Sequence, residues 1–513
     1  MVSSLKTRAF DVIVIGSGIG GMFAAVTAAT AGKRVLLLEA GKQHGGYTNP
    51  FRRGKYAFDP GLHYVGECGP GQQLTRQIER LGLAETLRFR ELDPDGFDRL
   101  VFPGYEVKTP KGAEVYRDRL ARDFPAERAG LDAFFALLAE FRQAVAALAR
   151  LKGVRSLLDV APHVPLLVRY ARATYAELLA PLIKDPLLRA VLAGQGGDYG
   201  LSPGRASAMI GLGVLDHYLG GAYFPLGGSK ALRDGLITAL EQRGGEHRRS
   251  ARVDRIIVDR GRAIGVECCG VELSARAVIS NVDATVTYGQ LLREPDAPRA
   301  SRRKAARTRQ SLASICLFIG TDLDVAAAGM TEANIWHYPS VDLDGFYDVM
   351  ARGSLPASDF FFLSSPSLKD PDNPTKAPPG HHTLELVTLA PFDPFAGWEG
   401  MKSMKRGAAY EELKARLADR YLGCVERYVP GIRDHVKALE VATPVTNVTY
   451  AASPRGAIYG PEYTPDQMGP LRFGAKGDVK GLFLCGSSTM GAGIVPCAVS
   501  GGQAGRLAVA SLR

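Results

Sequence analysis

The chain has 513 residues, which is long for one simple core and favours two closely joined domains. Hydrophobic residues make up 46% of it and charged residues 23%, a composition typical of a globular protein rather than a disordered or fibrous one. The net charge of +10 is spread along the chain without a nucleic-acid-binding motif, so we expect no nucleic-acid partner.

The seven cysteines show no CxxC spacing and no Cys/His metal pattern. An odd, unpatterned set favours a reducing compartment over a disulfide framework. The first ten residues are too short and too polar for a signal peptide, and no stretch offers about 20 uninterrupted apolar residues. The sequence therefore predicts a cytoplasmic protein without a metal site. Peripheral contact with the inner face of a membrane stays open.

The N-terminus carries a complete βαβ pattern. A β-branched run at residues 11–15, typical of a buried parallel strand, leads directly into the glycine-rich segment 16–21. An alanine-rich helix is predicted from Met22 to Ala31, and a second strand from Arg34 to Glu39.

Each part of this pattern suits a dinucleotide. Gly16 permits the tight turn, Gly18 lets the backbone approach a pyrophosphate, and Gly21 lets helix and strand pack closely. The helix N-terminus offers free N–H groups and a positive dipole end to the phosphates. Glu39, 18 residues after Gly21, is placed to accept hydrogen bonds from a ribose. On these residues alone, NAD and FAD both remain possible.

Four further motifs follow along the chain. They are the pair Gly45-Gly46, the segment FDPGLHYVG at 58–66, the segment FPLGGS at 224–229 and the segment GSSTMGAGIVP at 486–496. Two alternating runs at 251–258 and 263–267, joined by a turn, predict a strand pair, and a strand ending in ISNVD closes at Asp283.

Together these motifs resemble the phytoene desaturase, carotenoid isomerase and retinol saturase family of FAD enzymes. The resemblance implies FAD as the cofactor. It also implies an α/β fold, with a Rossmann-like FAD-binding domain of the amine-oxidase and phytoene-desaturase type and an inserted α+β substrate domain. Ser487 departs from the aspartate that many such proteins carry there. The residues implied to touch FAD are Gly16, Gly18, Gly21, Glu39, Gly45, Gly46, Val253 through its backbone, Gly486, Ser487 and Gly493.

The FAD-binding domain is expected to comprise residues 1–75, 220–295 and 471–513, and the substrate domain residues 76–219 and 296–470. Helical periodicity dominates 130–193, while the proline-rich stretch 366–379 predicts a loop. Two interpretations of the helical part remain open: a lid packed on the core, or a basic amphipathic surface resting on anionic lipid. The basic residues interleaved there are Arg142, Arg150, Lys152, Arg155, Arg169 and Arg172.

His63 and Tyr64 are the candidate catalytic residues, because they follow the FDPG turn that the resemblance places beneath the flavin. The alternative is that they are satisfied core residues. His217 and Tyr218, just before the FPLGGS segment, are weaker candidates.

The expected activity is hydride transfer at flavin N5 to or from a long apolar polyene: a carotenoid, a retinoid or another unsaturated lipid. Desaturase, saturase and isomerase activities all fit. A flavin amine oxidase is one alternative, and a lipid-binding protein like the GDP-dissociation inhibitors, without redox chemistry, is another. No second GxGxxG unit follows a strand, so we expect electrons to pass through a diffusible partner such as a quinone, oxygen or a redox protein.

Overall fold

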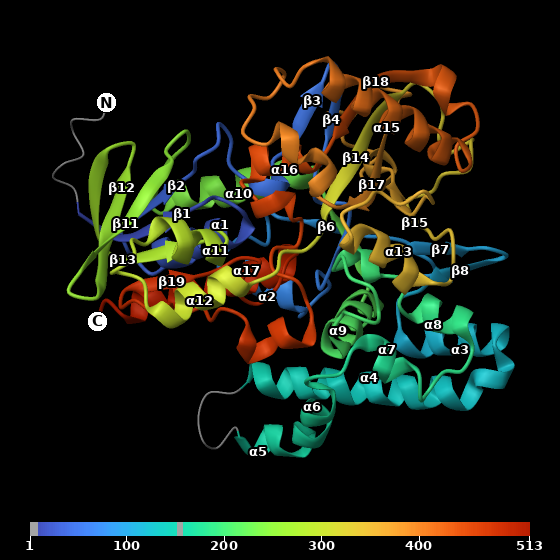
Figure 1. Cartoon of the computed structure of the whole chain (residues 1–513), viewed down its shortest axis with the longest axis horizontal. Helices are drawn as coiled ribbons and strands as arrows, with labels where there is room; N and C mark the ends of the chain where they lie inside the picture. Colours follow the sequence, from blue (N-terminus) through green and yellow to red (C-terminus); the bar gives the residue numbers. More distant parts are fainter. Residues whose placement is uncertain (1–8, 151–156) are drawn as a thin grey trace.

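The computed structural model describes residues 9–150 and 157–513. Within them, two seven-stranded sheets lie in separate halves of the molecule, and a group of helices projects from one edge (Figure 1). No helix in these two ranges is long and apolar enough to cross a membrane.

The first sheet is built around the N-terminal strand. Strand β1 (Phe10–Ile15) pairs in parallel with β2 (Val35–Leu38) and with β13 (Val271–Ser280). Both β1 and β2 are buried almost throughout, as parallel strands covered on two faces are. The sheet is completed by β10 (Glu246–Arg248), β11 (Val253–Asp259), β12 (Arg262–Cys268) and β19 (Leu482–Leu484). Segments from the start, middle and end of the chain therefore meet in one sheet.

Helices α1 (Ile19–Thr30) and α17 (Ile494–Ala510) pack against this sheet and against each other. Helix α1 begins three residues before the predicted Met22, because Gly18 serves as its N-cap. A Cβ atom at Gly501 would lie 2.1 Å from the carbonyl oxygen of Gly20, so the two helix backbones touch. Only glycine allows this approach.

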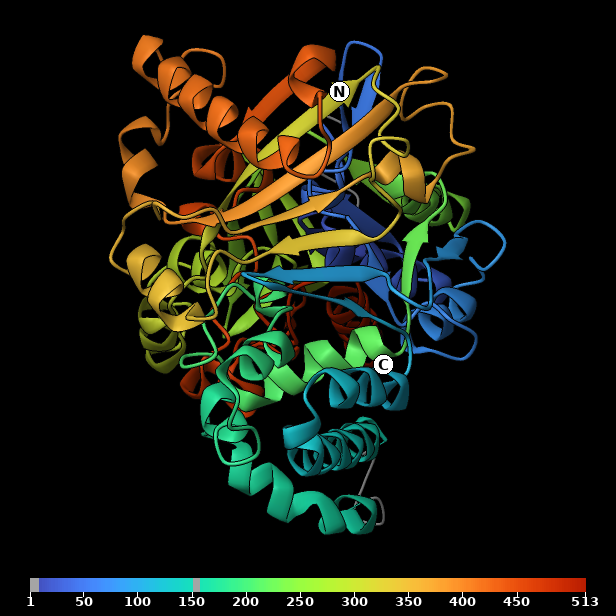
Figure 2. The same cartoon turned by 90° about the vertical axis from the view of Figure 1, so that its right-hand side faces the viewer.

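The second sheet has the order β18–β14–β17–β16–β15–β7–β8 and is antiparallel except where β15 meets β7. Helix α15 (Ala408–Glu426) packs on one face and α13 (Leu343–Ala351) lies near β15 (Figures 1 and 2). The strands are β7 (Asp98–Phe102), β8 (Tyr105–Thr109), β14 (Ala313–Thr321), β15 (Asn334–His337), β16 (Phe361–Ser364), β17 (His382–Ala390) and β18 (Val436–Ala442).

A helical lobe occupies the lower edge of Figure 1. Its longest member, α4 (Arg128–Ala149), buries Phe134, Leu138 and Phe141 on one face, as the helical periodicity predicts. Lys152 and Arg155 lie outside the described residues. The other helices are α3 (Ala113–Asp123), α5 (Leu157–Val160), α6 (Val164–Tyr170), α7 (Tyr175–Leu179), α8 (Pro186–Leu192) and α9 (Ala208–Leu219).

Short strands join the two halves. The hairpin of β3 (Phe51–Arg53) and β4 (Tyr56–Phe58) leads through the FDPG turn to β5 (Val65–Gly66), which pairs with β9 (Ala222–Pro225). His63 and Tyr64 therefore lie directly before β5, between the sheets. The other helices and strands of the described chain include α2 (Gln73–Arg80), β6 (Phe89–Glu91), α10 (Gly228–Gln242), α11 (Ala284–Val286), α12 (Arg299–Arg307), α14 (Pro366–Lys369) and α16 (Pro444–Ala451).

Candidate functional site

The first glycine turn has the geometry that a nucleotide-binding turn requires. Gly16 has a φ of +88°, a left-handed conformation that favours glycine. A Cβ atom at Gly21 would lie 1.9 Å from the carbonyl oxygen of Gly16, so a side chain there would push α1 off the strand. These two positions thus hold the start of α1 close to the end of β1.

The N-terminus of α1 is free to bind an anion. Its N-cap, Gly18, has no side chain to accept from the first N–H groups, and no acidic residue lies in the first turn. Such a helix end presents backbone donors and a partial positive charge, which suits a pyrophosphate.

The second glycine pair lies against this turn. Gly45 forms an isolated parallel bridge with Gly18, and its N–H donates to the carbonyl of Ser17 at 3.1 Å. Gly46 follows with a φ of +57°, and a Cβ atom on it would lie 3.6 Å from the Cα of Gly18. The two motifs, about 25 residues apart, form one glycine-lined surface.

The carboxylate of Glu39 lies over the same turn. Its Oε2 accepts from the backbone N–H of Ser17 at 2.9 Å and from the Ser17 hydroxyl at 2.6 Å, and its Oε1 accepts from the N–H of Gly41 at 2.7 Å. An ionised carboxylate has about four acceptor positions, so one remains on Oε1 for a ribose hydroxyl. Glu39 therefore fits the expected role while also fixing the turn.

His44 is a neighbour of this surface that the sequence did not single out. Its Nε2 lies 2.9 Å from Nδ1 of His247, and burial together with His247 lowers its pKa to about 4. The imidazole is therefore neutral near pH 7, and it adds no positive charge beside the glycine turn.

Val253 has its side chain in the hydrophobic core of the first sheet, where 6% of its surface is exposed. The segment just before it is tied to the Glu39 loop, because the N–H of Ala251 donates to the carbonyl of Glu39 at 2.8 Å. A contact of the Val253 backbone with adenine stays a prediction.

The closing motif reaches the same region from the other end of the chain. Gly486 has a φ of +84°, and its N–H donates to the hydroxyl of Ser500 in α17 at 3.0 Å. The backbone oxygen of Ser487 accepts from Arg472 at 2.7 Å. Gly493 is the N-cap of α17, again without a side-chain cap or an acid in the first turn. This chain end thus supplies a second helix N-terminus that lacks a side-chain cap.

His63 is held by a carboxylate from the second sheet. Its Nδ1 lies 2.9 Å from Oε2 of Glu385 on β17, and Oε1 of Glu385 accepts from the N–H of Asp59 at 2.7 Å. Glu385 is fully buried, whereas the His63 side chain is 16% exposed. The pair therefore fixes the imidazole and leaves its Nε2 for another partner.

Tyr64 is almost fully buried and stacks on Tyr218, with ring centroids 4.3 Å apart and planes 8° from parallel. Its hydroxyl contacts one carboxylate oxygen of Asp98 at 3.2 Å and one of Asp198 at 3.1 Å. The weaker candidate His217 accepts a hydrogen bond on Nε2 from the N–H of Gly66 at 3.0 Å, which is a structural role.

Lys369 has a fully buried amino group beside these residues. Its Nζ donates to the carbonyl of His63 and to the hydroxyl of Ser364, both at 2.7 Å, and to the amide oxygen of Asn334. Burial lowers its pKa to about 7, while the charges of Asp98 and Glu385 oppose that shift. The sequence missed Lys369, because it lies in the stretch 366–379 that predicts a loop. The structure corrects this: 366–369 form the short helix α14.

A buried ion pair joins two of the sequence motifs. Asp59 of the FDPG turn pairs with Lys376 and accepts from the N–H of Ser229, in the FPLGGS segment, at 3.0 Å. This contact explains physically why both motifs occur, since each supplies half of one buried polar cluster. A charge left unpaired there would be costly.

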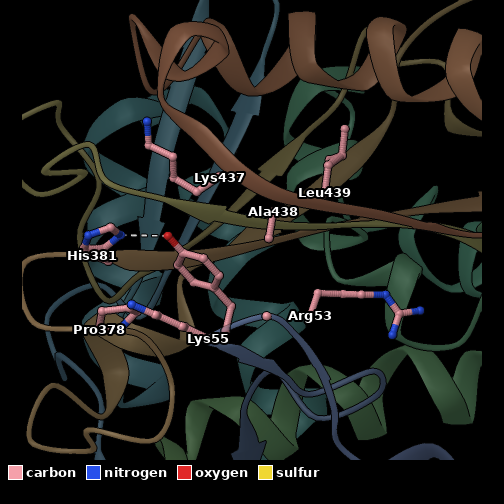
Figure 3. Close-up of a pocket in the computed structure, with 9 residues that line it drawn as sticks. Arg53, Lys55, Pro378, His381, Lys437, Ala438 and Leu439 are labelled. Atoms are coloured by element: carbon pink, nitrogen blue, oxygen red, sulfur yellow. Dashed lines mark hydrogen bonds between the residues drawn. The ribbon is translucent and has the colours of Figure 1, made fainter.

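A separate surface pocket of about 570 Å³ lies beside the β3–β4 hairpin and is lined by Arg53, Lys55, Tyr56, His381 and Lys437 (Figure 3). Its polar groups are largely engaged. Arg53 pairs with Glu440, Lys437 pairs with Asp322, and the Tyr56 hydroxyl contacts His381 at 2.7 Å. It shares no residue with the glycine surface or with the His63 pair.

The chain matches known proteins along almost its full length. Residues 19–506 match the sequence profile of a family described as flavin containing amine oxidoreductase. The all-trans-retinol 13,14-reductase of Danio rerio is 30% identical, with 98% of this chain and 85% of that protein covered. The prolycopene isomerase of Daucus carota is 26% identical, with 97% and 79% covered.

Solved structures agree on the architecture. The cyclohexylamine oxidase from Brevibacterium oxydans superposes with a TM-score of 0.63 at 18% identity, covering 98% of this chain and all of that one. An oxidoreductase from Methanosarcina mazei gives 0.64 at 16% identity, covering 96% and 98%. At these identities the likeness concerns the fold, and it confirms the predicted α/β fold of the amine-oxidase type.

Proposed function

The chain belongs to the flavin-containing amine oxidoreductase family and is an FAD-dependent oxidoreductase, and we propose that its substrate is a long apolar polyene. The observation that carries this proposal is the similarity to an all-trans-retinol 13,14-reductase over 98% of the chain, which includes the part predicted to bind the substrate. The predicted resemblance to retinol saturases and carotenoid isomerases is confirmed by these relatives.

The proposed FAD-binding residues are those of the glycine surface and the closing motif. Gly16, Gly18, Gly21, Gly45 and Gly46 would admit the phosphates. Glu39 would bind a ribose, Val253 the adenine, and Gly486, Ser487 and Gly493 the remainder. When bound, FAD supplies a hydride acceptor or donor at N5.

His63 and Tyr64 are the proposed catalytic residues. Both lie between the sheets, directly before the strand that follows the FDPG turn, and aromatic side chains surround them. The ring centroid of Phe362 is 5.3 Å from that of His63 and 4.8 Å from that of Trp336. An aromatic wall of this kind suits an apolar conjugated chain and excludes water from it.

Contact with an anionic membrane is proposed for the helical lobe, as the route by which an apolar substrate enters. Large apolar side chains are exposed on neighbouring helices, among them Leu158 on α5 (76% exposed) and Val168 on α6 (70%). Arg150, Arg169 and Arg172 are exposed around them, and Asp159 is the acidic exception next to Leu158. Exposed apolar groups flanked by arginines are typical of helices that lie on anionic lipid.

Purified protein tests the redox proposal directly. It should be yellow and bleach on reduction. Incubation with retinol, phytoene or an unsaturated fatty acid, with and without a quinone or oxygen, should yield a product that gains or loses one pair of hydrogen atoms or is a geometric isomer. Colourless protein without releasable FAD would favour the non-redox lipid-binding alternative. Turnover of amines but not polyenes would favour the amine oxidase alternative.

Vesicle sedimentation tests the membrane proposal. The protein should bind vesicles containing phosphatidylglycerol and not vesicles of phosphatidylcholine alone. The double variant Leu158→Glu/Val168→Glu should lose that binding. Met404→Glu alters a side chain that is 86% exposed outside the lobe, and it should bind as the wild type does. If the double variant binds these vesicles as well as Met404→Glu does, the assignment of the helical lobe as the membrane-binding surface is contradicted.

A further inference from the structure

The hydroxyl of Tyr64 touches carboxyl groups from two distant parts of the chain. Asp98 begins β7 in the second sheet, and Asp198 ends a single helical turn at 196–198 that precedes α9. The Tyr64 oxygen lies 3.2 Å from Oδ2 of Asp98 and 3.1 Å from Oδ2 of Asp198. Both distances are those of hydrogen bonds.

The proton count requires that one of these aspartates is protonated. A tyrosine hydroxyl carries one proton and can donate to one carboxylate only. The second contact would place two oxygen atoms without a proton against each other, unless that carboxyl group is itself the donor. Two carboxylates that share one hydroxyl partner also repel each other, which favours protonation of one of them.

The neighbours of the two groups assign the proton to Asp198. Asp98 accepts from the amide of Asn334 at 2.8 Å and from the amide of Gln195 at 3.0 Å. Among residues 9–150 and 157–513, the carboxyl group of Asp198 has Tyr64 as its one hydrogen-bond partner. Donors stabilise an ionised carboxylate, so Asp98 is the ionised member. Consistently, burial and the charge of Asp98 raise the pKa of Asp198 well above its usual range.

The titratable groups around Asp198 are one carboxylate and several tyrosines. The side chain is part-buried, and Asp98 is its nearest charged neighbour. Lys369 acts electrostatically on Asp98, where it opposes the effect of burial. The other titratable groups that face Asp198 are Tyr64, Tyr199, Tyr218, Tyr338, Tyr347 and Tyr459.

We propose that Asp198 is held as a neutral carboxylic acid and serves as the proton donor of the reaction, which prepares this enzyme for reduction of a carbon–carbon double bond. The role as donor rests on the polyene substrate proposed above. The protonation state of Asp198 does not depend on the identity of the substrate. Desaturation would require a base at this position instead.

The step balances as follows. One carbon of the double bond takes a hydride, which comes from the reduced flavin, and the other takes the proton of Asp198. The O–H bond of Asp198 breaks and its electron pair stays on the carboxylate, while the π electrons of the substrate form the new C–H bond. A proton from solvent restores the acid. A reduced quinone would return two electrons and one proton to the flavin, whereas a reduced redox protein would return the two electrons and the proton would come from solvent.

Infrared spectroscopy of the purified FAD-bound protein tests the protonation state. Near pH 7 the wild type should show a protonated-carboxyl C=O stretch that shifts in D₂O. This band should be absent from Asp198→Asn, kept in Asp98→Asn and displaced in Tyr64→Phe, where its hydrogen bond is lost. Loss of the band in Asp98→Asn alone, or its persistence in Asp198→Asn, overturns the assignment. FAD content and circular dichroism confirm that each variant is folded.

Turnover then tests the role. With enzyme chemically reduced in D₂O and all-trans-retinol, the wild type should place two deuterons on the product, one from Asp198 on one carbon and one from the exchangeable N5 position of the flavin on the other. Asp198→Asn should reduce at least about 100-fold more slowly, the scale of a lost general acid. An unchanged rate refutes the donor role. Failure of the wild type to reduce any polyene refutes the proposed substrate, while the infrared result still decides the protonation state.

Discussion

Nδ1 of His63 lies 2.9 Å from Oε2 of Glu385, although 322 residues separate the two along the chain. Glu385 is central in the second sheet and fully buried, and its other oxygen holds the backbone N–H of Asp59. One carboxylate thus sets both the position of the FDPG turn and the orientation of the imidazole that follows it. The second sheet thereby positions a residue of the N-terminal segment.

Glu385→Gln should therefore lower activity by changing the orientation and tautomer of His63. Asp59 and His63 face different oxygens of Glu385, and an amide has only one oxygen, so one of the two loses its acceptor. Where the NH₂ group faces His63, it favours the other tautomer of the imidazole. We expect kcat to fall about 10- to 100-fold with little change in KM, as for a displaced catalytic group. Nitrogen NMR of His63 should report the changed tautomer.

A matched control is available on the edge strand β18, which β14 separates from β17. Glu440 on β18 pairs with Arg53 and Lys414, so Glu440→Gln removes two ion pairs of the same sheet that do not involve His63. It should leave kcat and the His63 tautomer as they are. Equal loss of activity in both variants would point to general damage of the sheet rather than to positioning.

Glu39→Ala should weaken FAD binding. The substitution removes the acceptor proposed for the ribose and also releases the N–H and hydroxyl of Ser17. Loss of charged hydrogen bonds corresponds to about 1.5–3 kcal/mol, so the Kd for FAD should rise roughly 10- to 150-fold. Fluorescence titration of apoprotein with FAD measures this. Glu412→Ala, at an exposed site on α15, is the control. An unchanged Kd for Glu39→Ala would contradict the proposed binding of the ribose by Glu39.

The βαβ unit was predictable because its signal is local. Strand, turn, helix and second strand follow within about 30 residues, each with a residue type that its backbone conformation requires. The approach of Gly45 to Gly18 could be expected only from the family resemblance. Glu385, Lys369 and Asp198 were missed, because their roles depend on which distant segments become neighbours. A single buried glutamate in an apolar strand carries no spacing signal of its own.

Gly501→Ala should destabilise the packing of α17 on α1. The added Cβ would meet the backbone oxygen of Gly20 at 2.1 Å, and backbone cannot move aside as a flexible side chain can. Overpacking of this kind costs about 1–3 kcal/mol. It should also lower FAD affinity, because the start of α1 would shift. Thermal unfolding and FAD titration measure the two effects.

Gly423→Ala, in the helix α15 of similar length, should not lower stability as Gly501→Ala does. Its added Cβ would meet only the end of the Arg433 side chain, at 3.1 Å, which can move. Alanine stabilises a helix interior by roughly 0.5–1 kcal/mol relative to glycine, so this variant should be neutral or more stable. If both variants lose stability equally, the contact between α1 and α17 is not the cause.

Protonation of His217 should lower the stability of the protein in mild acid. Burial lowers its pKa to about 4 from an ordinary value of 6.5, and its Nε2 must stay unprotonated to accept from the N–H of Gly66. Between these two pKa values the unfolded chain binds the proton and the folded protein does not. The stabilisation is therefore complete above about pH 6.5 and is lost as the pH falls towards 4. From this group alone, the free energy of unfolding should fall by about 2 kcal/mol between roughly pH 7.5 and pH 5.

In His217→Gln, the amide oxygen can accept the same hydrogen bond without titrating, so urea denaturation should show a shallower loss than in the wild type. Parallel pH profiles for the two proteins would contradict the assignment.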